Sequence, residues 1–389
     1  MNPIISKRSA IKFVILLGIV SLFADMTYEG ARSISGQYLA ILGANGFIVG
    51  LVAGLGELVG YGFRLVSGYV TDRTGKYWLI TFIGYAINLL AVPFLALAGN
   101  WPLAASLMIL ERFGKAIRNP SKDAMLSFAT QKVGRGWGFG LHEALDQIGA
   151  IIGPLIVSCI LYYQGSYEMS FGILLIPAIC ALSVLACARM LYPTPQDLEI
   201  ENPSLKSEGF SKKYWLYIAA LCCVAAGFVD FPLIAFHFKK ASVMPDAWMP
   251  ITFSISMGAA GIASLVFGRL YDTKGFSVLI FATALSSFFA PFVFVDDFYF
   301  ALIGMILWGI GLGSQESIMR AVVADLVRMN KRGTAYGILN IWFGIFWFLG
   351  SALMGFLYDI SLISLILFSS GIQLVSIPIL FAVKNIKEE

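Results

Sequence analysis

Charged side chains are scarce in this sequence. Only 13% of its 389 residues are Asp, Glu, Lys or Arg, and 58% are hydrophobic. A soluble domain has about 25% charged residues. Because a soluble protein of this length needs more charge to cover its surface, the composition predicts an integral membrane protein.

Histidine and cysteine are also too few for a metal or redox centre. The two histidines are His142 and His237, and the five cysteines lie in apolar runs without metal-ligand spacing. No glycine-rich phosphate loop precedes a helical pattern. No basic face lies outside the apolar segments, so the net charge of +4 does not indicate nucleic-acid binding. We expect no enzymatic activity and no cofactor.

Long apolar runs are what the sequence has in abundance. A helix needs about 20 such residues to cross a bilayer. We predict an all-α integral membrane protein with 12 transmembrane helices, although charges interrupt the fourth and tenth. The predicted spans are residues 11–40, 46–71, 77–98, 101–129, 136–163, 168–191, 213–238, 247–271, 276–295, 298–326, 333–359 and 361–384.

Basic residues lie mostly in alternate loops. Arg73 and Lys76 follow the second span, and Lys212 lies between the sixth and seventh. The opposite loops are short and poor in Lys and Arg, with Lys239 and Lys240 as the exception. The positive-inside rule therefore predicts that both termini are cytoplasmic. We expect a monomer in a bacterial inner membrane.

The chain divides into two halves that repeat. A proline-rich and charged stretch at 192–212 separates an N-terminal six-helix bundle, 1–191, from a C-terminal one, 213–389. Gly68 to Gly75 matches Gly268 to Gly275, and Gly153 falls on Gly350, each about 200 residues later. An internal repeat of six spans is typical of transporters.

Several motifs resemble those of the major facilitator superfamily. The run Gly68-x3-Asp72-Arg73-x-Gly75-Lys76 is similar to the family's loop signature between helices two and three, with a weaker copy ending at Gly275. Arg112 stands where the family has a fourth-helix arginine, although Lys115-Ala116 replaces the usual Gln-Gly. The run Gly149-x3-Gly153-Pro154 resembles the antiporter-associated motif without its second glycine pair.

The resemblance implies two six-helix bundles related by a pseudo-two-fold axis, which move by alternating access around a central cavity. The sequence also resembles a bacterial branch of the family that is labelled as efflux permeases. On this basis we assign one group of residues to the cytoplasmic gate and the family motifs. In this group, Arg118 braces the gate or reaches the aqueous interface, and Asp123 accepts from Arg73. The group is Gly68, Asp72, Arg73, Gly75, Lys76, Arg118, Asp123, Gly149, Gly153, Pro154, Asp272 and Gly275.

Charged residues inside the predicted membrane segments are the candidates for binding and coupling. Each costs several kcal/mol in hydrocarbon unless it is paired or faces water. Acids and bases are nearly balanced in the N-terminal half, whereas Phe343 takes the repeat position of Asp146 in the C-terminal half. The residues assigned to substrate binding or proton coupling are Asp25, Glu29, Arg32, Arg112, Lys115, His142, Glu143 and Asp146.

These patterns favour a secondary transporter that moves a small organic solute, anionic or amphipathic, by proton-coupled export. Solute and proton would compete for one set of charges, as in an antiporter. A proton-coupled importer of an organic anion and a metal-cation exporter remain alternatives. The balance of bases and acids favours an organic solute over a metal, and the implied partners are that solute, protons and membrane lipids.

Overall fold

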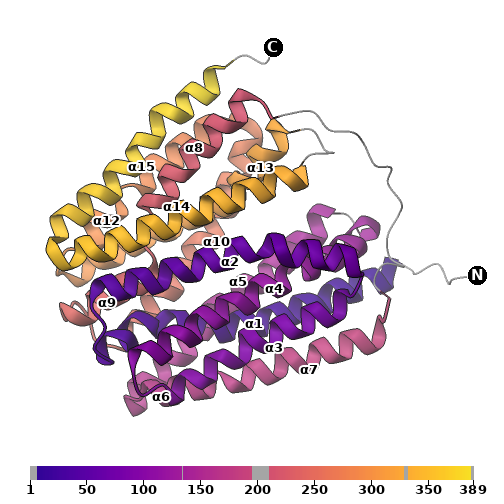
Figure 1. Cartoon of the computed structure of the whole chain (residues 1–389), viewed down its shortest axis with the longest axis horizontal. Coiled ribbons are helices and arrows are strands. Elements are labelled where there is room, and N and C mark those ends of the chain that lie inside the picture. Colours follow the sequence, from indigo (N-terminus) through magenta and orange to yellow (C-terminus); the bar gives the residue numbers. More distant parts are fainter. Residues whose placement is uncertain (1–6, 134, 195–209, 328–331, 387–389) are drawn as a thin grey trace, which may run out of the picture. The chain divides into compact units, whose positions relative to one another are not determined.

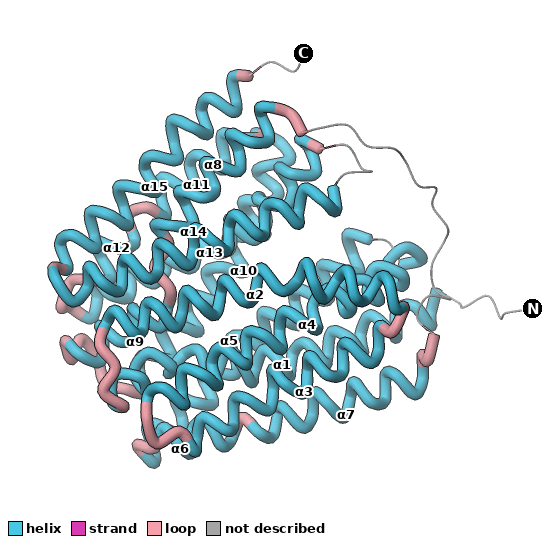
Figure 2. The backbone as a smooth tube through the Cα atoms, viewed as in Figure 1, coloured by secondary structure: helices cyan, strands magenta, loops and turns pink. Residues whose placement is uncertain are grey.

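The computed structural model describes residues 7–133, 135–194, 210–327 and 332–386, without the side chains of 130–140, 272, 320–321, 324–325 and 332–334. The described chain is built from helices joined by short loops (Figure 2). The first helices are α1 (Lys7–Ile41), α2 (Gly46–Thr74), α3 (Tyr77–Phe94), the 3₁₀ turn η1 (Leu95–Leu97), α4 (Trp101–Val133), α5 (Arg135–Gln164), α6 (Tyr167–Ile173) and α7 (Leu175–Leu191). They are followed by α8 (Lys212–Gly227), α9 (Phe231–Lys240), α10 (Trp248–Lys274), α11 (Phe276–Ser286), α12 (Phe289–Val293), α13 (Phe298–Leu326), α14 (Arg332–Ile360) and α15 (Leu362–Asn385) (Figure 1).

The helices confirm the predicted membrane segments. Within the described residues, 11 segments are long and apolar enough to cross a membrane. The twelfth segment is α4, whose charges exclude it on composition alone. Four spans are interrupted by a break or a tight turn, as between α8 and α9, so the chain has more helices than spans.

The helices pack into two compact units. Unit 1 comprises Met1–Arg32 with Gly62–Pro203, and unit 2 comprises Ser33–Tyr61 with Ser204–Glu389. Each of α1 and α2 therefore contributes one part to each unit. The division at 192–212 into two six-helix bundles stays a prediction, and most of that stretch lies outside the described residues.

Two glycines related by the internal repeat make the same contact in their own units. A side-chain carbon at Gly153 of α5 would collide with the backbone carbonyl of Met26 in α1. A side-chain carbon at Gly350 of α14 would collide with the carbonyl of Ala226 in α8. Small residues let membrane helices approach closely, so the repeat preserves one helix separation in both units.

A buried aromatic cluster occupies the break between α8 and α9 in unit 2. The Trp308 indole donates to the backbone oxygen of Val229 at 2.8 Å. The Trp347 indole and the Ser351 hydroxyl each donate to the Asp230 carboxylate at 2.8 Å. The Trp308 bond satisfies the Val229 carbonyl at the helix break, as hydrocarbon requires, and the other two bonds satisfy the buried Asp230 carboxylate.

The close contact at Gly153 gives a stability prediction. Gly153→Leu should lower the melting temperature in detergent, because overpacking a tight core costs about 1–3 kcal/mol. Gly258→Leu on α10 is the matched control, since an added side-chain carbon there meets open space. Equal melting temperatures for the two variants would show that the α1–α5 contact is not tight.

Candidate functional site

The candidate site lies in unit 1, where α1, α3, α4 and α5 bring buried polar side chains together. Gly149 lies against the carbonyl of Leu22, and a side-chain carbon there would come 3.0 Å from the Cβ of Asp25. Together with Gly153, this contact holds the Asp25 turn of α1 against α5. The glycine pair that the sequence linked to antiport therefore lies beside the site.

Basic residues of α4 form a stripe along one side of that helix. Arg112, Lys115, Arg118 and Lys122 are spaced three, three and four residues apart. The Lys115 ammonium lies 3.9 Å from the centre of the Tyr28 ring. A cation over an aromatic face is stabilised by the ring quadrupole, so Tyr28 substitutes in part for lost water.

Arg118 lies deeper than its assignment to the gate implied. Its side chain is only 2% exposed. The guanidinium lies 4.3 Å from the ring centre of Tyr85 and 5.6 Å from that of Tyr28. It therefore does not reach the aqueous interface, and the structure places it in the candidate site.

Asp25 is the central acid of the cluster. It is buried and interacts electrostatically with Asp146, Lys115, Arg118 and Glu29. Within the described part of the chain, no side chain or backbone group makes a hydrogen bond or ion pair with its carboxylate. A buried carboxylate with nearby cations but no direct partner can accept a proton or a donor group from a solute.

Asp146 anchors a chain of polar contacts. Its Oδ2 lies 3.4 Å from His142 Nδ1, and His142 Nε2 lies 3.1 Å from the Ser21 hydroxyl. The Lys122 ammonium donates to the same hydroxyl at 3.3 Å. These contacts form a chain that connects α5, α1 and α4 in the order Asp146, His142, Ser21 and Lys122. Each member of the chain has a group that can hold or transfer a proton.

Two further acids are paired locally. Glu111 accepts from the Asn88 amide at 2.6 Å and lies 3.4 Å from Arg112 Nε. Glu29 lies 3.8 Å from Arg32. These contacts divide the predicted cluster into paired acids at its edge and Asp25 at its centre.

Glu143 stands apart from the cluster. Its side chain is exposed and accepts a 3.3 Å hydrogen bond from Gln147. It lies one residue from His142, but the two side chains leave α5 in different directions. The structure therefore does not bring Glu143 together with the other assigned residues.

The loop signature after α2 is exposed. Asp72 has no hydrogen bond or ion pair among the described residues, and Arg73 donates to Tyr69 rather than to Asp123. Asp123 instead lies 3.8 Å from Lys122. The Asp272 side chain is outside the described residues.

The backbone conformation explains why each copy of the loop signature contains a glycine after the helix. Gly75 has φ +64° and Gly275 has φ +57°. Other residues rarely adopt this left-handed conformation. The repeat therefore keeps the same turn after α2 and after α10.

Sequence reasoning left several members of the site unassigned. Among the uncharged ones, Tyr28, Tyr85 and Ser21 each contact an assigned residue and Asn88 donates to Glu111, and Lys122 donates to Ser21. Tyr28 follows Asp25 by three residues and precedes Arg32 by four, so helical spacing could have indicated it. Tyr85 and Asn88 carried no such signal, because their role depends on the packing of α3 against α4.

Metal coordination has little support from this geometry. Among the described side chains, no group of three or more His, Cys, Asp or Glu residues is arranged to hold a metal ion. The cluster instead combines cations, carboxylates, hydroxyls and aromatic rings. That combination suits a solute with both polar and apolar parts.

The fold and the charged site within membrane-spanning helices define a secondary transporter. The family profile described as Major Facilitator Superfamily matches residues 16–351 and 240–388. The chain belongs to this superfamily, whose members are transporters rather than enzymes.

Relatives of similar length come from bacteria and archaea. An uncharacterized protein of Mycobacterium tuberculosis is 40% identical over 383 residues, covering 97% of this chain and 94% of its own. An uncharacterized MFS-type transporter of Methanocaldococcus jannaschii is 30% identical over 387 residues, covering 95% and 94%. Multidrug resistance protein MdtH of Proteus mirabilis is 36% identical over 133 residues, covering 34% and 32%.

Solved structures share the fold at low sequence identity. The crystal structure of the nucleoside transporter NupG aligns with a TM-score of 0.76 over 96% of this chain and 100% of that chain. Its sequence is 16% identical, so it supports the fold alone.

Proposed function

We propose that this transporter exports a small amphipathic organic solute in exchange for protons. The exchange uses alternating access of two six-helix bundles, with both termini in the cytoplasm of a bacterial inner membrane. The protein works as a monomer. Asp25 and Asp146 carry the coupling proton, and Lys115 holds a polar group of the solute.

The arrangement around Asp25 is the observation that supports this function most strongly. Its buried carboxylate lacks a direct partner in the described chain, whereas Lys115 and Arg118 lie close enough to interact with it. An ionised carboxylate in low dielectric needs a counter-charge, a hydrogen-bond donor or a proton. A solute with a donor group competes with the proton for this carboxylate, which couples the two.

Partial similarity to MdtH supports the outward direction. The matched segment covers about a third of each chain, and that relative is named a multidrug resistance protein. Amphipathic solutes are consistent with the rings of Tyr28 and Tyr85 beside the charges.

Import of an organic anion is the second candidate. The Lys115 ammonium has no ion pair among the described residues and rests on the Tyr28 ring. A solute carboxylate or phosphate could bind there directly. In that case, Asp25 would take up a proton as Lys115 turned to the anion, and solute and proton would move together.

A two-stage experiment tests the proposal. Purified protein is first screened by thermal shift against organic cations, anions, amphipathic drugs and divalent metal ions, since ligands stabilise the state they bind. Proteoliposomes with a defined pH gradient then report the direction of movement of the stabilising solute. Solute movement opposite to the proton supports export by exchange. Movement with the proton supports the importer, and stabilisation by a divalent metal alone overturns both.

The exposed loop acid Asp72 gives a gating prediction. Asp72 has no partner to lose in the described conformation, so Asp72→Asn should leave the melting temperature within about 1 °C, as expected for a surface change. If Asp72 closes the cytoplasmic gate in the other conformation, transport should fall several-fold. Cysteine labelling from each side should then shift toward the inward-facing pattern. Reduced transport with unchanged labelling would contradict the gating role.

A further inference from the structure

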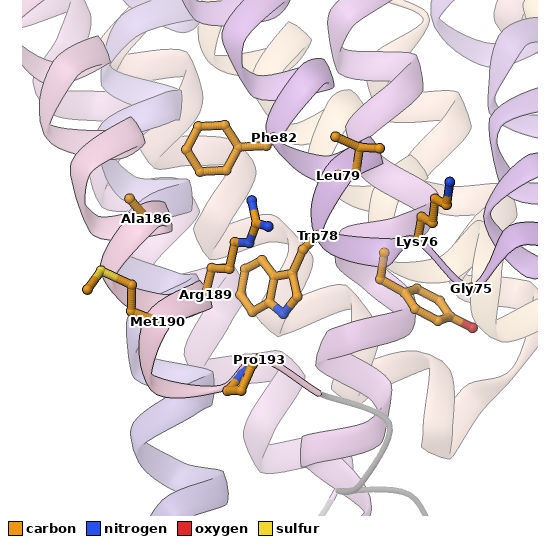
Figure 3. Close-up of a pocket in the computed structure, with 10 residues that line it drawn as sticks. Gly75, Lys76, Trp78, Leu79, Phe82, Ala186, Arg189, Met190 and Pro193 are labelled. Atoms are coloured by element: carbon orange, nitrogen blue, oxygen red, sulfur yellow. The ribbon is translucent and has the colours of Figure 1, made fainter.

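A pocket of about 640 Å³ lies between the start of α3 and the end of α7 in unit 1, apart from the charged site (Figure 3). Its volume falls in the ordinary range for small-molecule sites, roughly 300–1,000 Å³. It opens where the span Tyr77–Leu97 begins and the span Tyr167–Leu191 ends. The pocket therefore lies at the level where the bilayer meets water.

Two cations line this pocket without a partner among the described residues. Lys76 precedes the first residue of α3, and Arg189 lies in the last turn of α7. Both side chains are exposed, and neither makes an ion pair or side-chain hydrogen bond within the described chain. No Asp or Glu is among the described residues that line the pocket. Within the described part of the chain, the pocket thus presents positive charge without an acidic side chain beside it.

The remaining walls are apolar and accessible from the hydrocarbon side. Leu79 is 48% exposed and Met190 is 81% exposed, and Phe82 and Ala186 complete the wall. Figure 3 shows Arg189 extending from α7 toward α3, near the labelled ring of Trp78. A molecule that fills the pocket must place an anionic group near Lys76 and Arg189 and an apolar part along the helices.

The base of the pocket is held in place by hydrogen bonds. The Trp78 indole donates to the backbone oxygen of Tyr192 at 2.9 Å, and the Tyr192 hydroxyl donates to the Ser9 carbonyl at 3.0 Å. Phe13 packs against both rings, with centroids 6.1 Å from Trp78 and 5.0 Å from Tyr192. These contacts connect α1, α3 and the end of α7, so the pocket is formed before any ligand binds.

We propose that this pocket binds an anionic phospholipid, with its phosphate held by Lys76 and Arg189 and an acyl chain lying along Leu79, Phe82 and Ala186. Basic pockets between helices on the cytoplasmic side bind anionic headgroups, and each Lys or Arg near the surface contributes about 1 kcal/mol. The positive-inside pattern puts this end of α3 in the cytoplasmic leaflet. The proposal does not depend on which solute the protein transports.

Native mass spectrometry of delipidated protein tests the proposal. The protein is titrated with dioleoyl phosphatidylglycerol and separately with dioleoyl phosphatidylcholine. Wild-type protein should prefer phosphatidylglycerol. The double variant Lys76→Gln, Arg189→Gln should bind phosphatidylglycerol about 30-fold more weakly, since about 1 kcal/mol is lost for each base. Its affinity for phosphatidylcholine should not change.

Matched variants separate this site from general charge effects. The pair Lys212→Gln and Lys274→Gln removes two exposed lysines in unit 2 and should retain the preference for phosphatidylglycerol. Ala186→Phe fills the apolar wall without changing charge and should weaken phosphatidylglycerol binding. Melting temperatures of all variants in detergent micelles that contain phosphatidylcholine confirm folding.

Three outcomes would overturn the proposal. The first is equal affinity of wild-type protein for the two lipids, and the second is an unchanged preference in the Lys76, Arg189 double variant. The third is full competition by millimolar glycerol phosphate, which would make the pocket a site for a soluble phosphate. None of these three outcomes would affect the transport proposal, because the pocket and the charged site share no residue.

Discussion

Asp25→Asn should abolish gradient-driven transport while the solute still binds, with an affinity near that of the wild-type protein at low pH. The amide keeps the size of the carboxylic acid and one acceptor oxygen but cannot exchange a proton. Because Asp25 lies among Lys115, Arg118 and Asp146 without a direct partner, its titration is the step that the proposed exchange needs. Asp146→Asn should have the same effect through its contact with His142.

The measurement is solute movement in proteoliposomes with and without a pH gradient, together with binding to each purified variant. Glu168→Gln is the control, because that acid is exposed at the start of α6, away from the cluster. If both Asn variants retain wild-type gradient-driven transport, the cluster is structural.

The pH dependence of binding distinguishes the two proposed functions. If solute and proton compete for Asp25, affinity should fall as the pH is lowered, because the neutral acid accepts from the solute more weakly than the carboxylate does. If solute and proton bind together, affinity should rise as the pH is lowered. Asp25→Asn should flatten either dependence, so the sign in the wild-type protein identifies exchange or co-transport.

Lys115→Met should weaken solute binding about 100-fold. The substitution keeps an unbranched apolar side chain against Tyr28 but removes the ammonium that lies 3.9 Å from its ring. Hydrogen bonds to a charged group contribute about 1.5–3 kcal/mol, which corresponds to the expected loss. Direct binding to purified protein checks this value across pH.

Arg112 provides the comparison within the same helix. Its Nε lies 3.4 Å from Glu111, so its charge is already partnered. Arg112→Met, which also removes the charge, should therefore weaken binding less than Lys115→Met. An unchanged affinity in Lys115→Met would show that the solute does not contact the stripe on α4.

Hydropathy was sufficient to predict the membrane spans, whereas the arrangement of the fold was implied by the family resemblance. The ends of α2, α4 and α13 lie within a few residues of the ends of the predicted spans. The thickness of the bilayer sets the length of each helix, and polar loop residues mark where each helix ends. The repeat was visible as well, since Gly153 and Gly350 mark equal helix contacts.

The site could be predicted only in part. Charges in apolar segments are costly, so Asp25, Lys115 and Asp146 were conspicuous in the sequence. The pairing of bases with acids depends on the rotation of each helix about its axis and on the angles at which the helices cross. Hydropathy does not encode either of these. For that reason the burial of Arg118 and the exposure of Glu143 were not foreseen, and the tyrosines beside the cations were missed.

The aromatic cluster of unit 2 also makes the protein a natural optical probe. Phe228 lies 5.5 Å from Trp308 and 5.6 Å from Trp347, between centroids, and both indole N–H groups are hydrogen-bonded in the buried interior. Their fluorescence should be inaccessible to water-soluble quenchers such as iodide. Because the Trp347 indole donates to Asp230, movement of α14 against the broken helix should change the emission of this cluster without any attached dye.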